Sequence, residues 1–91
     1  MQYKSEKSLY LRKILGKTIK DLREKETGLS GNKFANEYEL GNGNLSRIEN
    51  AVTDCKVITA WRIAEALGLK LSDLIKRVEN SVGNDFKLTD E

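Results

Sequence analysis

Cysteine and histidine, the residues that most often bind metals or drive catalysis in small proteins, are almost absent from this chain. Cys55 is the only cysteine, and histidine is missing. An intramolecular disulfide, a Cys/His zinc site and every His-dependent catalytic arrangement are therefore excluded. A hydrolase built on Asp and Glu alone has no spacing in its favour. These residue types predict no catalytic site, no metal and no cofactor, and they favour a protein that acts by binding.

Cys55 lies in a polar stretch and is followed by Lys56. An exposed thiol can oxidise reversibly, so a redox sensor is one interpretation. Beyond Lys56 the sequence places no base beside the thiol that would activate it. An inert thiol is the interpretation that the sequence favours.

Basic residues are concentrated in the first 25 positions, although the net charge of the whole chain is only +2. They are Lys4, Lys7, Arg12, Lys13, Lys17, Lys20, Arg23 and Lys25. Such a segment could form a surface that contacts phosphates. The same pattern is also typical of an ordinary solvated helix face.

The spacing of the apolar residues predicts an all-α domain of five helices. Proline is absent, so glycine and polar caps must end the helices. Helices are predicted over residues 7–26, 31–38, 42–50, 57–67 and 72–79. Thr27-Gly28 should end the first helix, and Ser30 should cap the second.

The predicted fourth helix carries an apolar set that we expect to be buried: Ile58, Trp61, Ile63, Ala64 and Leu67. Beyond it, Gly83-Asn84-Asp85 is typical of a turn. Phe86 and Leu88 then alternate with polar residues. A short strand, an ordered extension and flexible disorder remain alternatives for this tail.

The length suits one domain. We expect a basic N-terminal extension (1–14) that leads into the first helix, a helix-turn-helix domain (15–79) and a C-terminal tail (80–91) that serves dimerisation or is disordered. No apolar run approaches about 20 residues, so no membrane association is expected. The first 15 residues lack the apolar stretch of a signal peptide, which points to the cytoplasm.

Two short predicted helices joined by Glu39-Leu40-Gly41 have the layout of a helix-turn-helix unit, in which the second helix enters the major groove of DNA. From Leu15 to Leu74 the chain resembles the Xre/Cro, lambda-repressor-like family of DNA-binding domains. The matching motifs are Leu15-Gly16, Ile19, Leu22-Arg23, Leu29-Ser30, Phe34-Ala35, Leu45-Ser46-Arg47-Ile48-Glu49 and Ile63-Ala64-Glu65-Ala66-Leu67-Gly68. The resemblance implies a five-helix lambda-repressor-like fold and double-stranded DNA as the partner.

The resemblance also implies a DNA-binding site on the third helix. Arg47 suits a two-hydrogen-bond contact to guanine and Asn42 a contact to adenine, each able to discriminate by about 1–3 kcal/mol. Residues at positions where family members reach base edges are Asn42, Gly43, Ser46 and Arg47; Asn44, Asn50, Asn32 and Lys33 are expected to contact phosphates. The alternative for Arg47 is a solvent-facing side chain paired with a nearby acid.

In the family, the positions of Arg23 and Glu49 form an ion pair that ties the first helix to the end of the third. A guanidinium can meet a carboxylate through two parallel hydrogen bonds. Breaking such a pair when it is deeply buried typically costs about 3–5 kcal/mol. We therefore expect these two residues to be structural.

The sequence departs from the family pattern at several positions. Glu39 replaces the usual turn glycine, so either the turn is altered or a strain of about 1–2 kcal/mol is tolerated. Gly43 inside the third helix costs roughly 1 kcal/mol relative to alanine but brings the backbone closer to a groove. Further departures are Gly31 for the glutamine that often binds phosphate, Ala51 for a glycine and Cys55 for a proline.

Two functions follow from these patterns. The first is a sequence-specific transcriptional repressor that binds as a homodimer, with Val78, Val82, Phe86 or Leu88 in the dimer contact. The second is a protein-interaction module on the same fold, such as an antitoxin or a phage regulator, which the acidic Glu37 and Glu39 favour. The patterns do not decide between repressor and activator, or among phage, restriction-modification and toxin-antitoxin processes.

Overall fold

Five α-helices make up most of the chain that this computed structural model describes, which is residues 5–90 without the side chains of Ser5, Asn42 and Asp90. Within this range no residue is in a strand, and the all-α prediction is confirmed. None of the described helices is long and apolar enough to cross a membrane. Lys4 of the predicted basic segment lies outside the described residues.

Helix α1 (Ser5–Leu22) is the longest element, and it continues into a wider π-helical turn over Arg23–Thr27. It starts two residues before the predicted position 7, so the described part of the basic extension is its first half. Gly28 ends the turn at φ 69°, where its N–H donates to the carbonyl oxygens of Arg23 and Glu24, both at 3.2 Å. This left-handed conformation is readily available to glycine.

Helices α2 (Gly31–Glu37) and α3 (Asn42–Glu49) form the predicted pair of short helices. The Ser30 hydroxyl accepts a hydrogen bond from the Lys33 N–H at 3.2 Å, so the predicted N-cap is confirmed. Phe34 and Ala35 on α2 and Leu45 and Ile48 on α3 are buried. Each helix thus turns one apolar stripe toward the core and leaves the rest of its surface to solvent.

Helix α4 (Val57–Ala66) packs through a different face from the one expected. Ile63, Ala64 and Leu67 are buried as predicted, but Ile58 is 69% exposed and Trp61 52% exposed, so those two predictions are wrong. Ala60 and Ala64 lie on the inner side, where small side chains let the helix approach the core closely. The larger Ile58 and Trp61 project from the opposite side.

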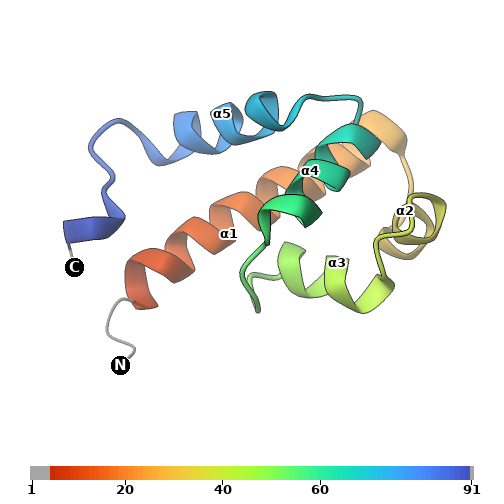
Figure 1. The fold of residues 1–91 in the computed structure, drawn as a ribbon, viewed down its shortest axis with the longest axis horizontal. Coiled ribbons are helices and arrows are strands. Elements are labelled where there is room, and N and C mark those ends of the chain that lie inside the picture. Colours follow the sequence, from red (N-terminus) through yellow and green to blue (C-terminus); the bar gives the residue numbers. More distant parts are fainter. Residues whose placement is uncertain (1–4, 91) are drawn as a thin grey trace.

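Helix α5 (Leu71–Val82) ends at Val82 rather than at the predicted Glu79. It runs back along α1, and the described tail returns to the beginning of α1 (Figure 1). There the rings of Tyr10 and Phe86 are 5.6 Å apart, and the Lys7 Nζ donates to the Lys87 carbonyl at 2.7 Å. Of the alternatives for the tail, the described residues follow the ordered extension, ending in a 3-10 turn at Leu88–Asp90.

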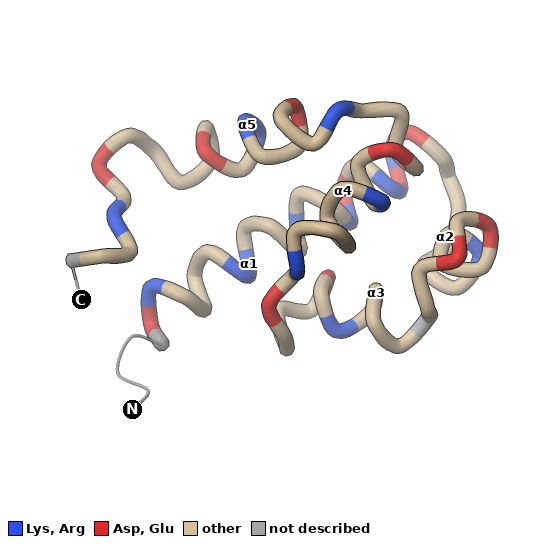
Figure 2. Tube along the Cα trace, viewed as in Figure 1, with Lys and Arg blue, Asp and Glu red and all other residues tan. Residues whose placement is uncertain are grey.

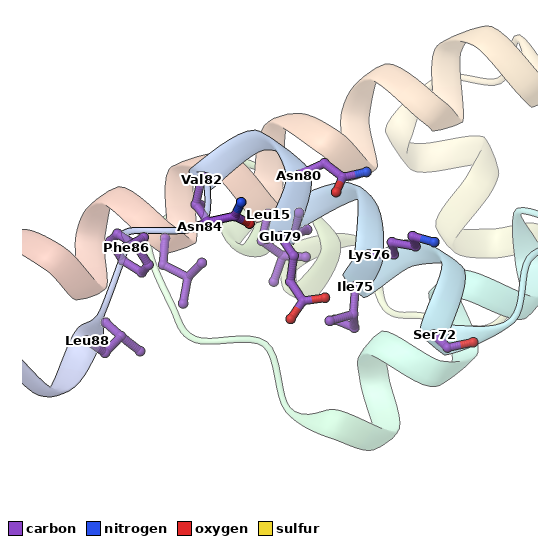
Figure 3. Close-up of a pocket in the computed structure, with 13 residues that line it drawn as sticks. Leu15, Ser72, Ile75, Lys76, Glu79, Asn80, Val82, Asn84, Phe86 and Leu88 are labelled. Carbon is purple, nitrogen blue, oxygen red and sulfur yellow. The ribbon is translucent and has the colours of Figure 1, made fainter.

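The core lies where all five helices meet. Its largest fully buried side chains are Phe34, Ile19, Leu45, Ile63 and Leu74, one from each helix. Beside it, α1, α5 and the tail border an open groove of 810 Å³, which Leu15, Phe86 and Leu88 help to line (Figure 3). The core therefore fixes α2 and α3 against α1, while the groove lies on the side formed by α5 and the tail.

Candidate nucleic-acid interface

The turn between α2 and α3 sets the angle at which α3 leaves the body of the domain. The Leu40 N–H donates to the Ala35 carbonyl at 2.8 Å, and the Leu40 side chain is buried. Glu39 adopts φ 57°, the left-handed conformation that a non-glycine residue takes at a cost of about 1–2 kcal/mol. Of the two alternatives raised by the sequence, the strained turn is the one observed. Leu40 holds that turn in place by its burial.

The exposed side of α3 carries most of the residues expected to contact DNA. We call Gly43, Asn44, Ser46, Arg47 and Asn50 the reading face; all five are exposed. Asn42 begins the helix, and its side chain lies outside the described part of the structure. The polar groups of this surface point away from the core because Leu45 and Ile48, on the other side of α3, are buried.

Arg47 lies along its own helix toward the first turn. A Cβ placed on Gly43 would come within 3.2 Å of the Arg47 Nη1, so the absence of a side chain at Gly43 makes room for the guanidinium. Within the described residues Arg47 makes no side-chain hydrogen bond and no ion pair with an acid. Its five donors are thus available to a ligand.

The other polar groups of the site either form hydrogen bonds with neighbouring residues or lie at the edge of the site. The Asn50 Nδ2 donates to the Ser46 carbonyl at 2.9 Å and to the Ser46 Oγ at 3.3 Å, so this amide partly satisfies itself. Asn32 and Lys33 are exposed in the first turn of α2. Asn32 and Ser46 line the same small groove of 280 Å³ between α2 and α3. The structure therefore brings Asn32 of α2 and Ser46 of α3 to the same groove.

The charges around this site are mixed. Basic positions follow α1, and Arg47 lies in the last turn of α3, whereas acidic positions gather at the end of α2 (Figure 2). Glu37 and Glu39 are both exposed there. On α1, the Lys17 Nζ donates to Asp21 at 2.9 Å, and this hydrogen bond raises the pKa of Lys17. The basic segment is therefore partly neutralised by its own neighbours.

Arg23 and Glu49 join α1 to the end of α3 in a buried ion pair. The Arg23 Nε donates to the Glu49 Oε2 at 2.8 Å and Nη2 to Oε1 at 2.9 Å, while Nη1 donates to the Leu29 carbonyl at 2.7 Å. The two side chains are 7% and 8% exposed. The hydrogen bonds with Glu49 raise the pKa of Arg23. These contacts fix the orientation of α3 relative to α1.

Gly16 allows the two helices to meet this closely. A Cβ at this position would lie 2.5 Å from the Ile48 carbonyl oxygen and 2.6 Å from that of Glu49. The chain therefore requires the absence of a side chain there. Gly16 belongs to a motif of the family resemblance, but the sequence alone gave it no role because the contact joins distant segments. We call Gly16, Arg23 and Glu49 the α1–α3 junction.

Arg12 has a role that sequence analysis missed. It was counted among the basic residues that could contact phosphates, but its Nη1 donates to the Val52 carbonyl at 3.2 Å and its Nε lies 3.6 Å from the Asp54 carboxylate. Arg12 therefore connects α1 to the loop that follows α3. Only Asp54, an acid distant in sequence, could have signalled the contact.

Cys55 lies in the same loop and is half-buried, with its Sγ 3.6 Å from the Lys56 carbonyl oxygen. Burial raises the pKa of the Cys55 thiol. A raised pKa lowers the fraction of reactive thiolate at neutral pH. This environment favours the inert thiol over the redox sensor.

Comparison with known proteins places this chain in a class. The chain belongs to the helix-turn-helix family, which matches residues 19–74 and confirms the predicted Xre/Cro, lambda-repressor-like resemblance. It is a DNA-binding transcription regulator, and its partner is double-stranded DNA. The chain is similar to the control protein C.MunI of a Mycoplasma species, with 33% identity over 64 residues that cover 70% of this chain and 86% of that protein. No solved structure matches the chain.

Proposed function

We propose that the protein is a sequence-specific repressor that inserts α3 into the major groove. The observation that carries this proposal is the exposed guanidinium of Arg47, which lies over Gly43 without a partner in the described residues. In the major groove a guanidinium can donate two hydrogen bonds to guanine. Asn42, Gly43 and Ser46 are the other proposed base-reading positions, with Asn44, Asn50, Asn32 and Lys33 on phosphates.

A domain of this kind can repress transcription by occupying the DNA that it binds. The described residues form a single small helical body whose family acts by binding DNA. A homodimer would contact two half-sites about 34–36 Å apart and cover the DNA between them. The similarity of this chain to a protein named a control protein supports a role in regulating gene expression.

The test is binding to DNA from around the protein's own gene at several salt concentrations. Wild type should bind tightly and weaken steeply with salt, because phosphate contacts release counterions. Arg47→Ala should lose preference for the specific fragment by about 1–3 kcal/mol with little change in salt slope, whereas Lys33→Ala should reduce that slope by about 1. Arg77→Ala removes the same charge from the exposed side of α5 and is the matched control.

The direction of control is read from transcription of the same fragment in a purified system. Addition of wild type should lower transcript yield, and Arg47→Ala should not. A rise in transcript would replace the repressor by an activator. No sequence preference at low salt would reject the proposal for that locus.

A protein-interaction module is the second candidate. Glu37 and Glu39 are exposed beside the reading face and would repel phosphates. Weak DNA binding with little salt dependence would favour this candidate. Glu37→Gln together with Glu39→Gln should strengthen DNA binding if the first proposal holds, and should leave it unchanged if the acids serve a protein partner.

A further inference from the structure

Arg12 joins the first half of α1 to the loop after α3, 40 positions further along the chain. Its Nη1 donates to the Val52 carbonyl at 3.2 Å, and its side chain is only 27% exposed. Its Nε is shielded from solvent and has no hydrogen-bond partner among the described residues; the Asp54 carboxylate lies 3.6 Å away and is 87% exposed. An ion pair with so exposed a partner contributes little. The hydrogen bond to Val52 is therefore the contact through which Arg12 can act.

Val52, the residue that Arg12 binds, also holds the end of α3. The Val52 N–H donates to the Arg47 carbonyl at 2.8 Å, and the Ala51 N–H donates to the Ile48 carbonyl at 3.1 Å. These bonds satisfy two of the carbonyl oxygens that the end of a helix leaves without partners. A single residue, Val52, thus connects the Arg12 guanidinium to the backbone of Arg47.

This ending of α3 depends on an unfavourable backbone conformation. Ala51 adopts φ 62°, in the left-handed region that disfavours any residue with a Cβ. Glycine is the residue usually found at this place in such an ending. Helix α3 has only eight residues, and a helix this short is not stable by itself. A contact from outside the helix can therefore stabilise the ending, and Arg12 supplies one.

The α1–α3 junction does not replace this contact. Arg23 binds the side chain of Glu49, the last residue of α3. Arg12 instead binds a backbone carbonyl at Val52, in the chain that leaves α3. The two arginines of α1 therefore hold different parts of the same helix end.

We propose that Arg12 is a positioning residue that orients Arg47 through Val52 and thereby sets the sequence preference of DNA binding. The inference rests on the proposed function, in which Arg47 contacts a base. A guanidinium that donates two hydrogen bonds to one base requires an accurately placed backbone. Phosphate contacts carry no sequence information of their own. Loss of Arg12 should therefore lower the sequence preference without changing the number of phosphate contacts.

The first experiment measures amide hydrogen exchange of the full chain without DNA by nuclear magnetic resonance. In Arg12→Ala the Val52 amide should exchange about tenfold faster, because the end of α3 opens more often. Lys13→Ala removes an exposed neighbouring charge and should leave that rate unchanged. The amide of Ile19 in the core is the internal reference. An unchanged rate at Val52, or an equal increase at Ile19, would overturn the proposal.

The second experiment measures binding to specific and nonspecific fragments at several salt concentrations. Arg12→Ala should lower the preference for the specific fragment by about threefold to tenfold, with the salt slope unchanged. Arg12→Lys keeps a charged donor on a long side chain and should recover part of the preference. Arg77→Ala removes an exposed guanidinium from α5 and should have no effect on it. A salt slope reduced by about 1 with the preference intact would make Arg12 a phosphate contact and overturn the proposal.

Combining Arg12→Ala with Arg47→Ala tests whether the two residues act as a unit. If Arg12 acts through Arg47, the double variant should lose no more preference than Arg47→Ala alone. Additive losses would mean that Arg12 acts by another route, and the proposal would be wrong. If Arg47→Ala has no effect on the preference, the proposed function fails, while the exchange rate at Val52 still decides whether Arg12 holds the end of α3.

Discussion

The two sides of α3 differ in where their polar groups find partners. At the α1–α3 junction, the Arg23 guanidinium is bound by Glu49 and Leu29, and almost no solvent reaches it. On the reading face, Arg47 is exposed and has no such partner within the described residues. One arginine therefore stabilises the domain, whereas the other is exposed and unpaired within the described residues. Residue type alone does not separate these two environments; burial and geometry do.

The largest loss of stability is expected when Glu49, on the buried side of α3, is replaced. Glu49→Ala leaves the buried Arg23 without its carboxylate, which should lower the free energy of unfolding by about 3–5 kcal/mol. Urea unfolding followed by circular dichroism measures the loss. Glu24→Ala removes an exposed acid and should change stability by no more than about 0.5 kcal/mol. Equal effects of the two variants would contradict a structural role for the buried pair.

Gly16→Ala tests the same junction without removing a charge. The new Cβ would clash with the carbonyl oxygens of Ile48 and Glu49, so α1 and α3 must move apart. We expect a loss of about 2–3 kcal/mol in the same urea experiment. Gly31→Ala is the control, because its Cβ would meet nothing closer than 4.0 Å. A neutral Gly16→Ala would mean that the close approach does not contribute to stability.

The turn before α3 offers a smaller effect of the opposite sign. Glu39→Gly should relieve the left-handed strain at φ 57° and raise stability by about 1 kcal/mol. Thermal unfolding at constant pH measures the gain. Glu39→Gln keeps the strain while it removes the charge, so it should show no comparable gain. A gain in Glu39→Gln alone would assign the cost to charge repulsion instead.

The smallest effect on stability is expected on the reading face. Arg47→Ala should change the free energy of unfolding by no more than about 0.5 kcal/mol, because the side chain is exposed and unpaired within the described residues. The measurement is the urea series used for Glu49→Ala. A loss as large as that of Glu49→Ala would make Arg47 a structural residue and end the contrast between the two arginines.

Much of the fold could be predicted because its signals are local. The apolar spacing on α1, the Ser30 cap and the Gly28 ending each depend on neighbours within a few residues, and all three agree with the structure. The family motifs then identified the helix-turn-helix class, which the family match confirms. Local patterns therefore predicted the order of the helices and their approximate bounds.

The parts that could not be predicted depend on contacts between distant segments. Ile58 and Trp61 fit a helical stripe, yet Ala60 and Ala64 decide which side of α4 faces the core. Arg12 was predicted to be an ordinary basic surface residue, because its contacts with Val52 and Asp54 form only when distant segments come together in the fold. At the candidate site, the exposure of Arg47 follows from the burial of Leu45 and Ile48. Its contact with a base stays a prediction.

The left-handed residues at the two ends of α3 have a consequence for its motion. The helix has eight residues, fewer than the roughly 12–15 at which isolated helices become even marginally stable, and Glu39 and Ala51 flank it with φ 57° and 62°. Its amides should therefore exchange with solvent through local opening more readily than those of α1. If α3 enters the major groove as proposed, bound DNA would suppress this opening, and part of the binding free energy would be spent as conformational entropy.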